Sequence, residues 1–130
     1  MLEIKPVQEK AEQQRLALLC GITYRPDDFM YVAYVDEKLV GVSQFGYENG
    51  AAWVHEIVCA PDTDDWDALF IMGRQTVNFI NLMGTSQAYA TVGEDAPQKA
   101  LFARIGFRAQ AQGAHRMDLD GFFDHPCSHH

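Results

Sequence analysis

Two side chains capable of acid–base chemistry, His55 and Glu56, stand next to each other in an otherwise apolar stretch. Residues 53–59 are rich in β-forming types and predict a buried strand. Because side chains alternate along a strand, we expect His55 and Glu56 on opposite faces, with one of them near any cleft. A buried carboxyl group with a raised pKa could act there as a general base. The alternative is a structural pairing with a polar residue of a neighbouring strand, such as Ser43 or Gln44.

The segment after this strand is crowded with carboxylates. It reads PDTDDWDA, and its acidic members are Asp62, Asp64, Asp65 and Asp67. Thr63, Asp64 or Asp65 can cap the start of the next helix, which is worth about 0.5–2 kcal/mol. The anion site that a helix start normally offers would then be filled from within the chain. An EF-hand calcium loop is excluded, because its sixth and twelfth positions need Gly and Glu, and here they hold Asp67 and Gly73.

Potential metal ligands gather at the end of the sequence. They are His125, Cys127, His129 and His130. Imidazole and thiolate groups suit Zn²⁺, but this spacing fits no established zinc finger or ribbon. The alternatives are a polar terminus, packing on a neighbour, and docking over a cleft.

Composition limits the classes of function. The chain has 130 residues, 48% of them hydrophobic, which fits one compact domain over residues 1–120 with a tail over residues 121–130. A formal net charge of -8 disfavours nucleic acid and anionic membrane as partners. No stretch resembles a signal peptide or a membrane span. We expect a soluble cytoplasmic protein, for which a homodimer is allowed but not required.

The cysteines agree with a reducing compartment. Cys20, Cys59 and Cys127 lie far apart and form no C-x-x-C pair, so a disulfide framework is not expected. Cys59 ends the predicted central strand and could carry an acyl group. A buried structural thiol is the commoner role for a cysteine with no adjacent positive group.

The elements that position these residues follow from hydrophobic periodicity and turn signals. Strands are predicted at residues 2–5, 29–35, 39–47, 51–59, 87–92, 107–111 and 115–119. Helices are predicted at residues 7–20, from the acidic segment to Gly84, and at residues 97–105. The first helix should bury Ala11, Leu16, Leu19 and Cys20, and the second Leu69, Met72, Thr76, Phe79, Ile80 and Met83. The strands at 51–59 and 87–92 flank the long helix, so they should be parallel neighbours.

This order of elements resembles the GNAT superfamily of N-acetyltransferases. The resemblance extends from Leu2 to about Leu119, and its local marks are Ala60-Pro61 after the central strand and Ile105-Gly106-Phe107 after the short helix. It implies an α/β fold with a mixed sheet of about six to seven strands, one splayed parallel pair and about three helices.

The resemblance also implies a substrate and a site. Acetyl-CoA would enter the splay, with Ile57, Val58 and Cys59 as the backbone edge and the segment from Tyr89 to Val92 as the opposite wall. The pyrophosphate would lie near Asp64, Asp65, Trp66, Asp67 and Ala68, and Phe102 would lie beside the cofactor. Glu56 or His55 would take the proton from an amine of a small molecule or a protein.

Several positions depart from the superfamily pattern. Its pyrophosphate loop reads Q/R-x-x-G-x-G/A, whereas this loop has no glycine. Phe102 stands where many members have a Tyr that protonates the leaving thiolate, and a core role is its plainer interpretation. Asp95 and Gln98 replace the Asn and Ala of the short helix. Two hypotheses therefore stand: an acyltransferase, and a non-catalytic protein of this fold that binds a small ligand or a protein partner, with metal stabilisation through the tail as a variant.

Overall fold

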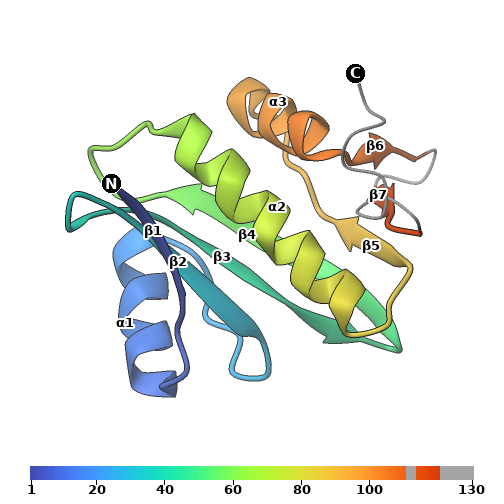
Figure 1. The fold of residues 1–130 in the computed structure, drawn as a ribbon, viewed down its shortest axis with the longest axis horizontal. Helices are drawn as coiled ribbons and strands as arrows, with labels where there is room; N and C mark the ends of the chain where they lie inside the picture. Colours follow the sequence, from blue (N-terminus) through green and yellow to red (C-terminus); the bar gives the residue numbers. More distant parts are fainter. Residues whose placement is uncertain (111–113, 121–130) are drawn as a thin grey trace.

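The computed structural model describes residues 1–110 and 114–120. The elements are β1 (Leu2–Pro6), α1 (Lys10–Cys20), β2 (Phe29–Val35), β3 (Lys38–Glu48), β4 (Ala51–Cys59), α2 (Trp66–Leu82), β5 (Gln87–Ala90), α3 (Ala96–Ile105), β6 (Arg108–Ala109) and β7 (His115–Asp118). The strands of this described part form one sheet in the order β1-β2-β3-β4-β5-β7-β6. Among the strands of the described residues, only β4 and β5 pair in parallel. Figure 1 shows α2 crossing one face of the sheet, with α1 beside β1 and β2. The predicted mixed α/β fold is confirmed.

Two tight turns join the three central strands. Asp36 and Glu37 have φ values of 50° and 69°, and Asn49 and Gly50 have values of 52° and 79°. Positive φ at both central residues matches the right-handed twist of the strands on either side. The two predicted hairpins are confirmed.

Helix α1 covers one face of the sheet, and it buries fewer residues than predicted. Leu16 and Ala17 are fully buried and pack with Met30, Val32 and Val42. The prediction was wrong for Leu19, which is 45% exposed, and for Ala11, which is exposed. The polar side chain of Gln13 is buried instead, because its amide donates to the Val7 carbonyl oxygen at 2.7 Å. This hydrogen bond fixes which face of the helix turns inward.

The start of α1 also differs from the prediction. The helix begins at Lys10 and not at Val7, because the Val7 N–H bonds the Met30 carbonyl oxygen at 2.8 Å. That bond continues the ladder between β1 and β2 past the end of β1.

Helix α2 covers the opposite face. Leu69, Met72, Thr76 and Ile80 are buried as predicted, whereas Met83 caps the helix end and is 58% exposed. A Cβ at Gly73 would overlap the side chain of Ile105 and crowd that of Ile57. The absence of a side chain at Gly73 therefore lets α2 lie close over both β4 and α3.

Strands β4 and β5 separate after a short contact. Their paired residues are Ala52 with Ala88, Trp53 with Tyr89, and Val54 with Ala90. Strand β5 ends at Ala90, while β4 continues to Cys59 along β3. The predicted splay is confirmed, and residues 55–59 of β4 form one side of a wedge.

The C-terminal hairpin is shorter than predicted. Strands β6 and β7 pair Arg108 with Arg116 and Ala109 with His115. The turn predicted around Gly113, and the tail with His125, Cys127, His129 and His130, lie outside the described residues. None of the described helices is long and apolar enough to span a bilayer.

Candidate active site

Along β4, the backbone N–H and C=O groups of every second residue face the wedge. The Ala60 N–H bonds the Val40 carbonyl oxygen at 3.0 Å, so Ala60 and, two residues earlier, Val58 direct their polar groups to β3. The groups of Ile57 and Cys59 therefore face away from β3, into the wedge. The predicted backbone edge thus consists of Ile57 and Cys59, and the polar groups of Val58 are used within the sheet.

One side chain from α3 reaches this edge. The Gln98 amide donates to the Ile57 carbonyl oxygen at 2.9 Å, across the gap between α3 and β4. Gln98 is itself positioned by its backbone N–H, which bonds the capping carboxylate of Asp95 at 3.2 Å. The Ile57 carbonyl is therefore accessible as an acceptor in the wedge, and a side-chain amide binds it.

Two pockets lie near these elements. One of about 380 Å³ lies between the end of β1, α1 and the start of β2, away from the wedge. A smaller one of about 250 Å³ lies between the start of α2 and α3. The smaller pocket is lined by Trp66, Pro97, Ala100, Leu101 and Arg104. It has an apolar wall and one guanidinium group, and Leu101 is one helical turn from Gln98. This pocket lies on the side of α3 that is next to the start of α2.

The start of α2 is hydrogen-bonded by its own loop. The Asp64 carbonyl oxygen accepts from the Trp66 N–H at 2.9 Å, and the Asp65 carboxylate accepts from the Ala68 N–H at 3.0 Å. Asp67 pairs with Arg104 at 2.8 Å. The prediction that an acidic residue caps this helix is confirmed for Asp65. The N–H groups that could cradle a phosphate are partly occupied.

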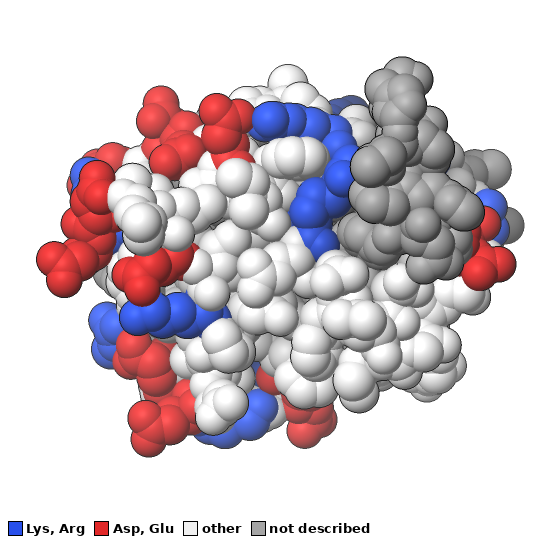
Figure 2. Space-filling view, in the orientation of Figure 1, with Lys and Arg blue, Asp and Glu red and all other residues white. Residues whose placement is uncertain are grey.

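Acidic side chains surround this helix start. A hollow of about 470 Å³ beside it is lined by Asp36, Asp62, Asp64 and Asp65, with Lys38 as its basic member. Figure 2 shows carboxylates gathered over the end of the molecule where β4 leads into α2, and basic groups farther along α2 and α3. The field at this end opposes an approaching polyanion.

A β-bulge reshapes the middle of β4. Gln44 pairs with Glu56 and Phe45 with Val54, which leaves His55 as the extra residue. The prediction of opposite faces for His55 and Glu56 was wrong, because the extra residue interrupts the alternation. Both side chains lie on the face away from α2, where Gln44 bonds the Thr23 carbonyl and the Arg25 N–H.

His55 stands between two carboxylates. Its Nδ1 lies 2.7 Å from Asp28 Oδ2, and its Nε2 lies 2.8 Å from Glu48 Oε2. His55 and Asp28 are 9% and 7% exposed, so this pair is buried, whereas Glu48 reaches solvent. Hydrogen bonding from His55 lowers the pKa of Glu48. Both ring nitrogens can donate at once only as imidazolium. The structural alternative for His55 is thus realised, with partners other than Ser43 and Gln44.

Glu56 has the more reactive environment of the two. Its side chain is half-buried, and burial raises the pKa of its carboxyl group, opposed by the nearby His55 and Arg25. A raised pKa makes the carboxylate a stronger proton acceptor, which suits a general base.

Sequence reasoning missed Asp28 and Glu48. One signal was available, because a glycine inside a strand often marks close approach by another group. At Gly46 a Cβ would overlap the Asp28 carboxylate. Gly46 thus makes room for the acidic partner of His55.

An aromatic surface adjoins this polar cluster. The ring of Tyr89 on β5 lies against Trp53 with centroids 5.4 Å apart, and Trp53 stacks on His55 at 6.4 Å. The Tyr89 hydroxyl donates to Gln87 Oε1 at 3.1 Å. Tyr89 thus lies beside Trp53, in the paired part of β4 and β5 before the two strands separate, and not opposite Ile57 and Cys59.

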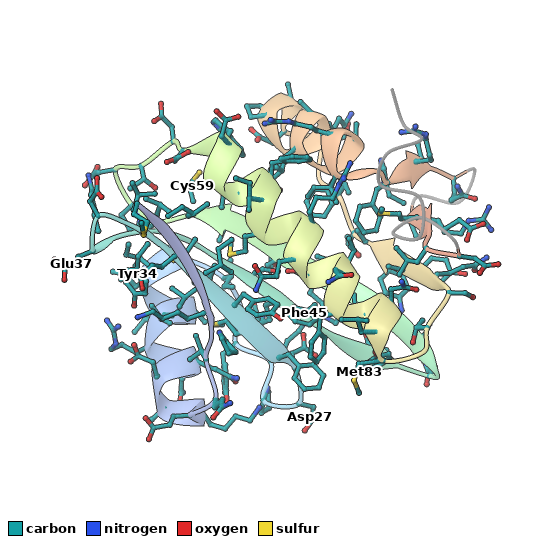
Figure 3. The ribbon with its side chains drawn as sticks, in the orientation of Figure 1. Asp27, Tyr34, Glu37, Phe45, Cys59 and Met83 are labelled. Carbon is teal, nitrogen blue, oxygen red and sulfur yellow. The ribbon has the colours of Figure 1, made fainter. Side chains whose placement is uncertain are left out.

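Phe102 and Cys59 do not have the environment of reactive groups. Phe102 is 2% exposed and packs edge-on against Phe107, with centroids 5.5 Å apart, so the core interpretation is confirmed. Burial, reinforced by Asp64, raises the pKa of the Cys59 thiol, which keeps it protonated. Figure 3 shows Cys59 beside the start of α2 and Phe45 beneath its middle.

No cluster of three or more metal-binding side chains occurs in residues 1–110 and 114–120. The predicted ligands in the tail lie beyond this range.

Solved structures share this fold. The IAA acetyltransferase from Bacillus cereus has a TM-score of 0.73 at 19% identity, over 92% of this chain and 100% of that one. An acetyltransferase from Bacillus subtilis in complex with CoA has a TM-score of 0.72 at 17% identity, over 92% and 99% of the two chains. A GNAT family acetyltransferase from Elizabethkingia anophelis with acetyl-CoA bound has a TM-score of 0.67 at 12% identity, over 91% and 98%. From these structural matches, the chain has the fold of GNAT acetyltransferases. The sequence matches no family model and no curated protein.

Proposed function

We propose that the protein binds acetyl-CoA through its pantetheine arm and transfers the acetyl group to an amine. The observation that carries the proposal is the separation of β4 from β5 directly beside the bulge that holds Glu56. The pocket between α2 and α3 supplies the entrance. Structures of the same fold hold CoA and acetyl-CoA, which supports this ligand.

The proposed chemistry uses Glu56 as the base. An amine nitrogen attacks the thioester carbonyl carbon, the C–N bond forms, and the C–S bond breaks with departure of the thiolate. The Glu56 carboxylate accepts the proton that the amine loses, and its raised pKa brings its basicity closer to that of an amine. Phe102 has no proton to donate, so the proton that Glu56 has accepted passes through solvent to the departing thiolate, which also returns Glu56 to its carboxylate form.

The charge of the site favours a cationic acceptor. Free amines of small molecules and proteins are mostly protonated at neutral pH. Asp28 and Glu48 are already bonded to His55, so Glu56 is the carboxylate of this cluster that remains to attract such a cation.

The first test is ligand binding followed by turnover. Acetyl-CoA at 100 times its Kd should raise the stability by about 2.7 kcal/mol, visible as a higher unfolding midpoint. Release of free thiol should then depend on an added amine, measured with a panel of diamines, amino acids and peptides. Absence of a midpoint shift at millimolar acetyl-CoA would exclude this cofactor.

A non-catalytic binding role is the second candidate. The self-capped start of α2 and the buried Phe102 favour it, because both depart from what cofactor chemistry uses. In that case acetyl-CoA or another ligand would bind without thiol release for any amine. Alanine at Asp64, Asp65 and Asp67 should then leave the biological role of the protein intact.

A further inference from the structure

We infer that Gln98 is a built-in competitor for the wedge, and that it sets the affinity for any ligand whose amide binds the Ile57 carbonyl. This inference rests on the proposed function, because it concerns the same groove. It assigns to Gln98 a role in ligand affinity that its position on α3 alone does not reveal.

The position of Gln98 on α3 is the first observation. The residues of α3 that face the sheet are Leu101, Phe102 and Ile105, all at most 3% exposed. Gln98 precedes them at the same helical spacing and is partly buried, so it lies where this buried stripe meets the surface. Its side-chain amide points along the same face of α3, toward the sheet. Its partner is a backbone atom of β4, beyond the last residue that pairs with β5.

The chemistry of this contact is the second observation. The group that Gln98 presents is a carboxamide N–H, and its 2.9 Å contact with the Ile57 carbonyl has the length of a well-formed hydrogen bond. A pantetheine arm carries secondary amides, which offer the same donor. Gln98 therefore places on Ile57 the functional group that an amide-bearing ligand would bring.

Binding of such a ligand then requires an exchange. The Gln98 amide leaves the Ile57 carbonyl, the ligand amide replaces it, and the released carboxamide turns to solvent. The number of hydrogen bonds is nearly conserved, so the ligand gains little from this contact. Shortening the side chain removes the competitor and leaves the acceptor free.

The experiment compares Gln98→Ala with Gln75→Ala, a control on the exposed side of α2. Titration calorimetry with pantetheine and with CoA should give an affinity about 2- to 10-fold tighter for Gln98→Ala than for the unmodified protein. Gln75→Ala should match the unmodified protein. Gln98→Met keeps the length and lacks the donor, so it separates competition by hydrogen bonding from simple filling of space.

The outcomes separate this inference from the proposed function. Equal affinities would overturn only the inference, and weaker binding by Gln98→Ala would overturn it by making Gln98 a ligand contact. Binding of neither probe by any variant would overturn both. A ligand-free readout keeps the inference testable: the carbonyl ¹³C resonance of Ile57 should move in Gln98→Ala and stay in place in Gln75→Ala, and an unmoved resonance would refute the contact.

Discussion

The two ends of the wedge differ in the polar groups that they leave free to bind a ligand. At the inner end, β4 parts from β5 beside a bulge that presents the half-buried Glu56. At the outer end, the loop before α2 turns back on itself, so that Asp64 and Asp65 satisfy N–H groups of the helix start. At the inner end the carboxyl group of Glu56 is available to a ligand, whereas at the outer end the N–H groups of the helix start are already hydrogen-bonded.

This difference indicates which part of a ligand the chain recognises. An extended, uncharged arm gains from burial in the apolar pocket, whereas a diphosphate meets occupied N–H groups and a hollow lined by carboxylates. We therefore expect the arm to supply most of the binding free energy. The predictions below test the two ends separately.

The largest effect is expected at the inner end. Glu56→Gln keeps the size of the side chain but removes the base, so amine-dependent thiol release should fall by about 10²- to 10⁴-fold. Glu94→Gln is the control, because Glu94 is exposed and pairs with Lys99 away from the bulge. Steady-state kinetics with acetyl-CoA and the best amine measures the ratio. Unchanged turnover in Glu56→Gln would remove Glu56 from the mechanism.

The next effect concerns the buried partner of His55. Asp28→Asn keeps the shape but loses the negative charge that faces the ring, and it should lower the free energy of unfolding by about 1 to 3 kcal/mol. Asp27→Asn is a matched control on the neighbouring exposed residue. Urea unfolding of both variants gives the comparison. A loss of stability equal in the two would mean that the Asp28–His55 contact contributes nothing.

A smaller effect is expected at the outer end. Asp65→Ala removes the side-chain cap of α2 and should cost about 0.5–2 kcal/mol. Asp64→Ala is the control, because the Asp64 contact is made by its backbone oxygen and survives the substitution. Asp65→Ala also frees the Ala68 N–H, so it should tighten CoA binding more than pantetheine binding. If both ligands respond equally, the two ends of the wedge are not independent.

The sequence predicted most of the fold because the signals for it are local. The strands of the two hairpins, their turn residues and the buried stripe of α2 are each encoded within a few neighbouring residues. The splay followed from the resemblance in the order of elements. Short-range patterns therefore sufficed for the scaffold of the site.

The pairings inside the site depend on contacts between distant residues. His55 and Asp28 are 27 residues apart, and Gln98 and Ile57 are 41 apart. The bulge arises from the register between β3 and β4, which alternation within β4 alone cannot reveal. For the same reason the faces of His55 and Glu56 were predicted wrongly, and the inward turn of Gln13 on α1 was missed.

The smallest effect is the pH dependence of stability due to Glu56. Burial raises the pKa of this carboxyl group above its ordinary value, so the folded protein holds the proton more tightly than the unfolded chain does. The stabilising contribution of protonated Glu56 is present below the unfolded pKa and is lost as pH rises through the folded pKa. Glu56→Gln does not titrate, so relative to the unmodified protein it should gain stability as pH rises from the unfolded pKa through the folded pKa.

Urea unfolding of both proteins across this range measures the difference, with Glu94→Gln as a control of opposite sign. Pairing with Lys99 lowers the pKa of Glu94, so its contribution grows as pH rises and the substitution should lose stability. A gain for the unmodified protein over Glu56→Gln would mean that attraction from His55 and Arg25 exceeds the cost of burial. The inner end of the wedge would then hold a stable carboxylate in place of a base with a raised pKa, and its contrast with the outer end would disappear.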